Sequence, residues 1–225
     1  ITKTGAGTVV LSNNNTYTGA TTISAGTLSV TGSLSDSTAV SVASGATYNV
    51  GASDTIAALT GAGNVTLNSY TLTLGNASGT YSGVMSGTGG LTVSGGSQTL
   101  SGANTYTGAT TVSGGTLSLG ANDVIADSSA LTVSGGTFAV GTYSDTVGAV
   151  SLSSGSITGT TGVLTGSSYS VSNATGTTTI SAILGGSGDL TKTGAGTVVL
   201  SNNNTYTGAT TISAGTLSVT GSLSD

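Results

Sequence analysis

Residues Thr2 to Asp36 read TKTGAGTVVLSNNNTYTGATTISAGTLSVTGSLSD, and the same stretch returns unchanged as Thr191 to Asp225. Because Thr2 recurs as Thr191, the chain has a sequence period of 189. Self-similarity at a fixed period is typical of architectures that stack one unit on the next. The sequence predicts a single continuous repeat domain over residues 1–225 and argues against a protein built around one site.

A shorter repeat lies inside this period. The octapeptide NTYTGATT begins at Asn15, Asn104 and Asn204, which divides the period into half-repeats of 89 and 100. A Gly-Thr-Leu-Ser segment follows each octapeptide at a fixed distance. We expect the tyrosine and the leucine of each half-repeat to be structural anchors that pack on their own neighbours; they are Tyr17, Tyr106, Tyr206, Leu28, Leu117 and Leu217.

Asparagines precede the tyrosine in the two identical segments. One interpretation is an internal amide ladder along a corner of the fold, in which side-chain amides bond to one another. The other interpretation is a solvated turn, because asparagine also favours turns. The residues concerned are Asn13, Asn14, Asn15, Asn202, Asn203 and Asn204.

Short strands recur at a finer spacing. Tyr48 follows Leu28 at a spacing of 20, and Phe138 follows Leu117 at a spacing of 21. Each begins an apolar, polar, apolar triplet, which places alternate side chains on one face of a strand. Gly, Ser, Asn and Asp separate the triplets, and these residues favour turns. No window has apolar residues at helical spacing, so we expect essentially no α-helix.

A coil of about 20–21 residues with short strands fits a parallel β-helix, or β-solenoid. Each strand pairs with its equivalent one coil above and below, and the inward side chains stack into an apolar column. Thr, Val and Ile favour strands, and the 39 glycines supply corners. No proline is present to interrupt the backbone ladder. The sequence predicts an all-β solenoid and leaves two or three strands per coil open.

Composition excludes several classes of function. The chain has no His, Cys, Glu or Arg, which removes the usual general bases, activated thiols and guanidinium groups and leaves seven aspartates. The closest pair, Asp123 and Asp127, lies in a sequence typical of a turn, where aspartate caps its own backbone. We therefore expect no enzyme, no catalytic residue, no cofactor and no metal site.

The only cationic side chains are Lys3 and Lys192, and the net charge is −5. These two ammonium groups cannot neutralise a phosphate backbone, which excludes nucleic acid as a partner. We expect them to keep the surface soluble. No apolar run reaches eighteen residues, so we expect no transmembrane segment in this chain.

The stretch from Thr4 to Val30 resembles the autotransporter-associated β-strand repeat found in bacterial passenger domains. The same pattern appears from Gly95 to Leu119 and from Thr193 to Val219. The resemblance implies a right-handed parallel β-helix that a Gram-negative bacterium exports to its outer surface or releases. It implies a scaffold in a large adhesin or filament, without catalytic residues.

We expect a structural role, as a stalk or filament in which neighbouring copies of the repeat stack end to end. An alternative is an adhesin that meets a host-cell, bacterial or polysaccharide surface through an outward loop within Ser154 to Gly166, since inserted loops often carry binding. A minor alternative is ice binding. It rests on Thr-X-Thr patterns at Thr16 and Thr18, Thr71 and Thr73, and Thr105 and Thr107.

Overall fold

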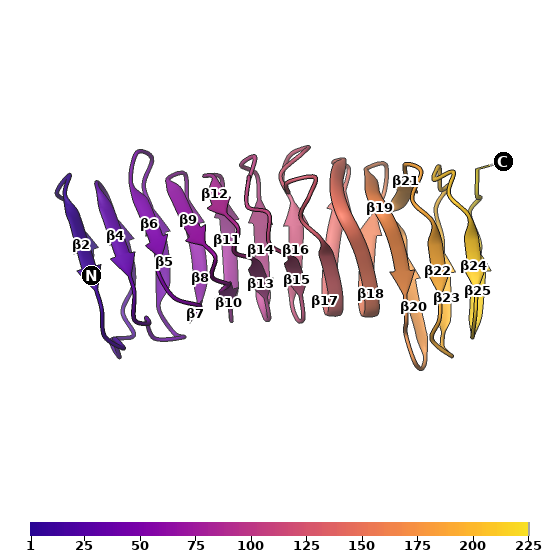
Figure 1. Cartoon of the computed structure of the whole chain (residues 1–225), viewed down its shortest axis with the longest axis horizontal. Coiled ribbons are helices and arrows are strands. Elements are labelled where there is room, and N and C mark those ends of the chain that lie inside the picture. Colours follow the sequence, from indigo (N-terminus) through magenta and orange to yellow (C-terminus); the bar gives the residue numbers. More distant parts are fainter. Residues whose placement is uncertain (225) are drawn as a thin grey trace.

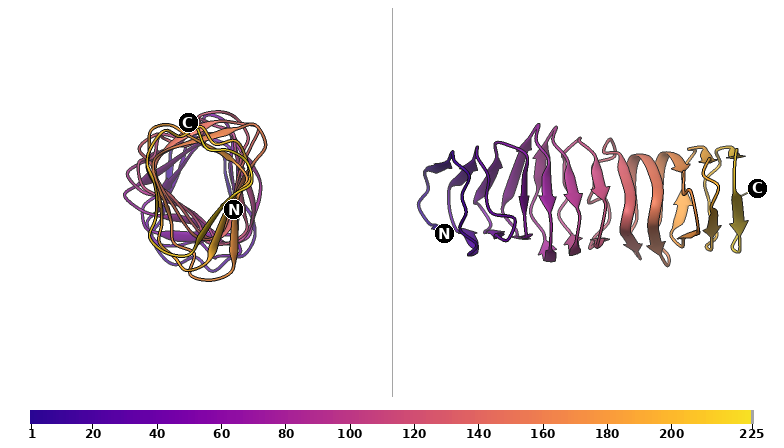
Figure 2. Two further views of the ribbon diagram at one scale, coloured as in Figure 1. Left: turned by 90° about the vertical axis from the view of Figure 1, so that its right-hand side faces the viewer. Right: turned by 90° about the horizontal axis from the view of Figure 1, so that it is seen from below.

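The computed structural model describes residues 1–224 as a parallel β-solenoid of about 11 turns, with about 19 residues per coil and no helix among those residues. The coils follow one another in chain order along a single axis, and the two termini lie at opposite ends (Figure 1). Viewed along this axis, the coils superpose into one closed outline (Figure 2). The predicted fold class is confirmed. At about 4.8 Å per coil, the rod is about 53 Å long.

Each coil passes through three parallel ladders, which we name by their pairing. Ladder 1 contains β1 (Thr2–Lys3), β3 (Thr21–Ile23), β5 (Ala39–Val42), β8 (Ala58–Gly61), β11 (Ala77–Tyr81), β14 (Gly96–Leu100), β16 (Thr116–Leu119), β20 (Thr177–Ile180), β23 (Thr197–Leu200) and β25 (Thr216–Val219). Ladder 2 contains β2 (Thr8–Leu11), β4 (Thr27–Val30), β6 (Thr47–Val50), β9 (Asn64–Asn68), β12 (Met85–Gly87) and, further along, β21 (Ile183–Gly185). Ladder 3 contains β7 (Asp54–Ile56), β10 (Leu72–Leu74), β13 (Leu91–Val93), β15 (Thr110–Val112), β22 (Leu190–Lys192) and β24 (Thr210–Ile212).

Three long strands bend around corners and serve more than one ladder. They are β17 (Leu131–Gly141), β18 (Asp145–Gly159) and β19 (Val163–Val171). Where the octapeptide crosses ladder 2, no strand forms, yet the backbone bonds continue: the Thr105 N–H donates to the Met85 carbonyl over 2.8 Å. A coil therefore has three strands, or two strands and a third side without a strand, which is an octapeptide in some coils and residues 31–38 or 120–130 in others.

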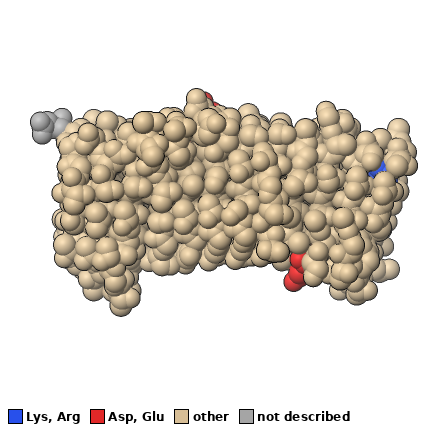
Figure 3. All heavy atoms as spheres, turned by 180° about the vertical axis from the view of Figure 1, so that it is seen from behind, with Lys and Arg blue, Asp and Glu red and all other residues tan. Residues whose placement is uncertain are grey.

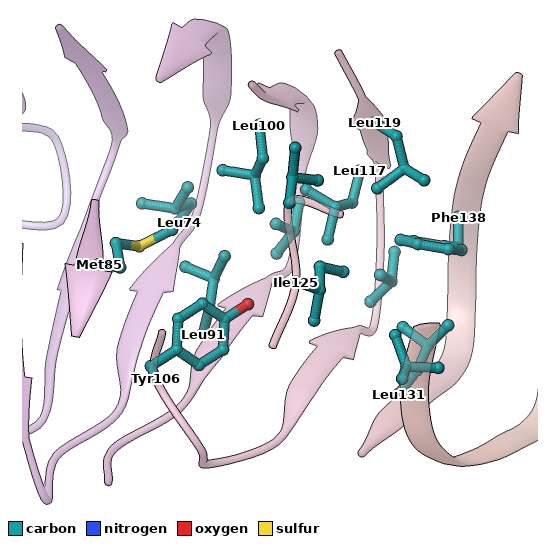
Figure 4. Close-up of a cluster of buried hydrophobic side chains, with 14 of the residues drawn as sticks. Leu74, Met85, Leu91, Leu100, Tyr106, Leu117, Leu119, Ile125, Leu131 and Phe138 are labelled. Carbon is teal, nitrogen blue, oxygen red and sulfur yellow. The ribbon is translucent and has the colours of Figure 1, made fainter. Parts of the chain in front are cut away.

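The core is a set of stacked inward columns, and each column takes one residue from each coil. In ladder 3, Leu72 pairs with Leu91, which pairs with Thr110, and then Leu131 follows. The strands alternate buried and partly exposed residues, as in β10 and β13. Figure 4 shows how Leu91 and Leu131 project into the same interior as side chains from the other ladders. Alternation in the sequence thus becomes a continuous apolar interior.

Coil length varies around the expected value. Leu28 pairs with Tyr48 and Leu117 with Phe138, so the spacings of 20 and 21 each mark one coil. Many other coils are shorter, as from Thr21 to its partner Val40, and bring the mean to about 19 residues per coil. The strands keep their register while the turns between them differ in length.

The prediction of an outward loop within Ser154 to Gly166 is wrong. Most of this segment lies in β18 and β19, which pair with the coils on both sides. The longest coil instead has residues 172–176 between β19 and β20, so that Ile157 pairs with Ile180. The sequence misled because outward strand positions in this chain are as rich in Gly, Ser and Thr as its turns.

The two identical 35-residue segments lie on different ladders. In the first, Thr2–Lys3 belongs to ladder 1 and Thr8–Leu11 to ladder 2. In the second, the equivalent strands β22 and β23 belong to ladders 3 and 1. The full sequence period therefore comprises nine coils and an advance of two further ladders. The longer half-repeat covers five complete coils, whereas the shorter half-repeat ends one ladder short of five.

Candidate functional site

The asparagine that begins the octapeptide bonds groups in three coils. Asn104 is buried, and its Oδ1 accepts the Met85 N–H of the coil below over 2.8 Å. Its Nδ2 donates to the Gly102 carbonyl at 2.9 Å and to the Val124 carbonyl of the coil above at 2.7 Å. One amide side chain thus satisfies backbone groups that no strand pairs in this corner. We call this arrangement the asparagine clip.

The same clip occurs in the other octapeptides. Asn204 Oδ1 accepts the Leu184 N–H over 3.0 Å, and its Nδ2 donates to the carbonyls of Asn202 and Ser222. Asn15, in the first coil, donates to the carbonyls of Asn13 and Ser33. The identical sequence therefore repeats the two donor bonds of the clip at both ends of the solenoid.

The other asparagines of the two runs lie nearer the surface. Asn13, Asn14 and Asn203 are exposed, and Asn202 donates to the carbonyls of Thr160 and Ser181. A hydrogen bond between the side-chain amides of two asparagines is found elsewhere, on ladder 2. There Asn68 Nδ2 donates to Asn49 Oδ1 over 3.0 Å, and Asn49 Nδ2 donates to Ser29 Oγ over 2.9 Å. The sequence signal for this pair was only its spacing of one coil.

The tyrosine of the octapeptide points inward. Tyr106 is fully buried beside Leu91 and Ile125, and its hydroxyl bonds the hydroxyl of Thr110 at 2.6 Å (Figure 4). Thr110 in turn bonds Ser129, which donates to the Gly108 carbonyl at 2.7 Å. Burial raises the pKa of the Tyr106 phenol well above its ordinary value, so it stays neutral.

Among the remaining anchors, those in the first and last coils are less buried than those further inside the solenoid. Leu28 and Leu117 are fully buried, and Tyr206 is 3% exposed. Tyr17 and Leu217, in the first and last coils, are only partly buried. Tyr17 and Tyr206 repeat the bond to the threonine four residues on, at 2.8 and 2.7 Å. The Tyr206 ring also lies 6.0 Å from the ring of Tyr169.

The sequence analysis did not predict a role for two aspartates that the structure buries. Asp54 and Asp145 occupy matching places in the two half-repeats, each after a serine. Asp54 Oδ2 accepts the Leu34 N–H of the coil below over 2.9 Å. Asp145 Oδ2 accepts the N–H groups of Val124 and Ile125, both at 3.1 Å. These carboxylates join coils as the asparagine clip does.

Burial controls the ionisation of both carboxyl groups. It raises the pKa of Asp54, against two backbone hydrogen bonds that lower it. Burial, aided by the negative charges of Asp123 and Asp127, raises the pKa of Asp145 from 3.8 to about 7, against two backbone hydrogen bonds that lower it. Asp145 Oδ1 has no hydrogen-bond partner within residues 1–224. The only sequence signal for these two buried carboxyl groups was a serine-aspartate pair that follows a turn.

The expectation that the lysines keep the surface soluble is wrong. Lys3 is 7% exposed and Lys192 is fully buried. Lys192 stands above Val171 in an inward column of ladder 3, and its Nζ donates to the carbonyls of Gly194 and Ala214. Lys3 makes the equivalent bonds to Gly5 and Ala25. Corner carbonyls that face inward thus accept the ammonium group.

Ladder 3 carries a rank of hydroxyl side chains on its outer surface. One threonine or serine per coil occupies the central strand position, between two inward residues. The paired residues are Thr55, Thr73, Thr92, Thr111, Thr132, Ser151, Ser170, Thr191 and Thr211. Of the Thr-X-Thr patterns, the structure places only Thr73 in this rank.

The two aspartates weighed for catalysis are exposed. Asp123 and Asp127 lie on a turn at the surface, and Asp123 adopts a positive φ of 51°. Within residues 1–224, no three His, Cys, Asp or Glu side chains gather closely enough to hold a metal ion. The described part of the chain also has no helix of the length and apolarity needed to cross a membrane.

Comparison with protein families identifies the repeat. The passenger-associated-transport-repeat matches residues 1–30, 94–119 and 190–219, each of which contains one octapeptide. No curated protein and no solved structure matched the chain. The repeat points to a secreted or cell-surface bacterial protein and, together with the solenoid, to a structural and non-enzymatic role. Three segments of the chain therefore match the passenger-associated-transport-repeat, consistent with a repeat of autotransporter passengers.

Proposed function

We propose that this chain is a rod segment, a stalk or filament portion of a protein displayed outside a Gram-negative bacterium. The observation that carries the proposal is the parallel pairing of ladder 1, which links every coil from β1 to β25 through all three matched repeats. Asparagine clips and buried aspartates add side-chain bonds between the same coils. In such a rod, the number of coils sets the reach.

The proposal predicts that length scales with repeats. Adding one further unit, a second copy of residues 37–225 after Asp225, adds nine and two-thirds coils and lengthens the rod by about 46 Å. Electron microscopy and small-angle scattering measure this length and the unchanged cross-section. Placed between an outer-membrane anchor and an epitope, the longer chain should move the epitope outward by the same distance. An unchanged reach would contradict a spacer role.

Ice binding is a second candidate, and the hydroxyl rank of ladder 3 favours it. Nine outward threonine or serine residues at a spacing of about 4.8 Å form a regular array that can order water. Thermal hysteresis of the purified chain measures this activity directly. Replacing Thr92 and Thr111 by lysine interrupts the rank, while the same change at Thr105 and Thr107 serves as control. Absence of hysteresis at high protein concentration removes the candidate.

A further inference from the structure

A polar cavity lies on the outer surface where three successive coils cross ladder 3. Its volume is about 320 Å³, and six residues line it: Asp36, Ser53, Asp54, Thr55, Thr71 and Thr73. Asp36 belongs to the side without a strand, residues 31–38, and Thr55 and Thr73 pair in β7 and β10 of the two coils above. Every side chain of the lining carries a carboxylate or a hydroxyl group. The volume lies at the lower end of the range for ligand sites.

Backbone hydrogen bonds hold the acceptors of this cavity in place. Asp54 Oδ1 accepts the Thr55 N–H over 3.0 Å, and Oδ2 accepts the Leu34 N–H of the coil below over 2.9 Å. Each oxygen keeps a further lone pair, since a carboxylate offers about four acceptor sites. Ser53 Oγ accepts the Thr71 N–H over 3.1 Å, which fixes this hydroxyl between two coils. The cavity is therefore ordered before any ligand arrives.

The two carboxylates of the cavity are not neutralised by a lysine. Burial raises the pKa of Asp54 against two backbone hydrogen bonds, and the negative charge of Asp36 raises it as well. The only lysines, Lys3 and Lys192, bond carbonyl groups at other corners. Uncharged residues cover nearly all of the face shown in Figure 3, so a pair of carboxylates is unusual on this molecule. Repulsion excludes an anionic ligand, whereas a ligand with several hydroxyl donors fits.

The cavity lies at one end of the hydroxyl rank of ladder 3. Thr55 and Thr73, which line the cavity, are also the first two members of the rank. The next members, Thr92 and Thr111, follow in register at about 4.8 Å per coil. Hydroxyl groups both donate and accept hydrogen bonds, and the hydroxyls of a sugar chain do the same. The surface thus offers a pocket for one sugar and a track for the units beyond it.

We propose that this cavity binds a neutral sugar unit of a glycan, and that the hydroxyl rank of ladder 3 carries the chain beyond it. Sugar hydroxyls donate to the carboxylates of Asp36 and Asp54 and exchange hydrogen bonds with the four hydroxyl side chains of the lining. Bonds to a charged acceptor are stronger than neutral ones, so the two carboxylates contribute most of the affinity. The site adds a binding activity to the proposed rod and does not depend on it.

The second half-repeat supplies a matched control. Asp127 corresponds to Asp36, because each stands 18 residues before the buried aspartate of its half-repeat. Val163 corresponds to Thr71, because each donates its N–H to the serine of the coil below. The second half-repeat therefore repeats the carboxylates without the full set of hydroxyls.

Titration of the full chain with neutral oligosaccharides tests the site. The probes are di- to hexasaccharides of glucose, galactose, mannose and N-acetylglucosamine, followed by NMR spectroscopy of the backbone amides. At least one series should shift the amides of Thr55, Thr71 and Thr73, and its affinity should rise with chain length. Asp36→Asn should weaken this binding about tenfold, as expected for one hydrogen bond to a charged group, whereas Asp127→Asn should bind like the wild type.

A second pair of variants tests the hydroxyl groups at nearly constant volume. Thr73→Val removes one hydroxyl from the cavity and should weaken binding a few-fold. Thr66→Val removes a hydroxyl from the central position of β9, on ladder 2, and should leave binding unchanged.

Three outcomes would overturn the proposal. The first is no shift at the cavity amides with any of the four sugar series at millimolar concentration. The second is a shift with calcium chloride and none with sugars, which would make the cavity a cation site. The third is equal sugar affinity for Asp36→Asn and Asp127→Asn. Rod length in electron microscopy is unaffected by all three, so the proposed rod function is judged separately.

Discussion

At the scale of single residues, an asparagine side chain replaces the bonds of a missing strand. Asn104 makes three hydrogen bonds to three coils in a corner where the octapeptide breaks ladder 2. Asn104→Leu fills a similar volume but leaves buried backbone groups without partners. We expect a loss of about 2–4 kcal/mol in unfolding free energy and faster hydrogen exchange at the Met85 amide.

The first octapeptide supplies the matched control for this change. Asn15 donates two bonds in the partly exposed first coil, and water can reach the same groups there. Asn15→Leu should therefore cost well under half as much. Urea unfolding compares the two variants, and equal losses would show that the clip contributes nothing beyond local turn formation.

The Asp145 carboxyl group makes stability depend on pH. Burial raises its pKa in the folded chain from 3.8 to about 7, so the folded state holds this proton more tightly than the unfolded state. Stability from this group is therefore greatest below about pH 4 and is lost as the pH rises through about 7. A tenfold change in proton affinity corresponds to about 1.4 kcal/mol, which limits the loss to about 4 kcal/mol.

Asp145→Asn keeps an acceptor oxygen for the Val124 and Ile125 amides and cannot ionise. Its unfolding free energy, measured by urea titration across this pH range, should fall less steeply toward neutral pH than that of the wild type. Parallel pH profiles for wild type and Asp145→Asn would contradict a buried ionisable group.

At the scale of elements, glycine allows strands to turn corners against the coil below. Gly155 within β18 has a φ of +84°, and a Cβ there would lie 2.1 Å from the Gly136 carbonyl oxygen. Gly45 has a φ of +81° but open space around it, and Gly19 has open space alone. Alanine substitutions at these three glycines separate the cost of a positive φ from the cost of a collision with the coil below. We expect almost no change at Gly19, a loss of about 1 kcal/mol at Gly45 and a larger loss at Gly155.

Thermal or urea unfolding of the three glycine variants provides the measurement. Backbone collision at Gly155 cannot be relieved by a side-chain rotation, so its variant should also show a local change in the contact between β17 and β18. An equal loss at Gly45 and Gly155 would mean that coil spacing yields easily.

The sequence predicted the strands well because alternation is a local property. Leu28 with Tyr48 and Leu117 with Phe138 gave both the coil and its inward face. The asparagine clip and the burial of Lys192 could not be predicted in this way, because their partners lie in neighbouring coils or at corners whose carbonyl direction depends on the turn. Composition alone marked Lys192 as a surface residue, since lysine is rarely buried.

At the scale of the whole molecule, small differences in turn length accumulate into a change of face. The shorter half-repeat carries the octapeptide from ladder 3 at Tyr17 to ladder 2 at Tyr106, whereas the longer half-repeat returns it to ladder 2 at Tyr206. No local sequence signal encodes this phase, because it is the sum over many coils. The identical segments consequently face different sides of the rod.

Spin labels can detect this rotation in the existing chain, which contains no cysteine. Cysteines at the exposed positions Thr18, Thr107 and Thr207 mark equivalent places in the three octapeptides. Thr107 and Thr207 lie five coils apart on one ladder, so their backbone separation is about 24 Å. Thr18 and Thr107 have nearly the same axial separation, about 22 Å, but lie on different ladders, which adds a displacement across the rod. Pulsed dipolar spectroscopy should therefore find the longer distance between the two residues that are closer in sequence, and the reverse order would mean that all three octapeptides lie on one ladder.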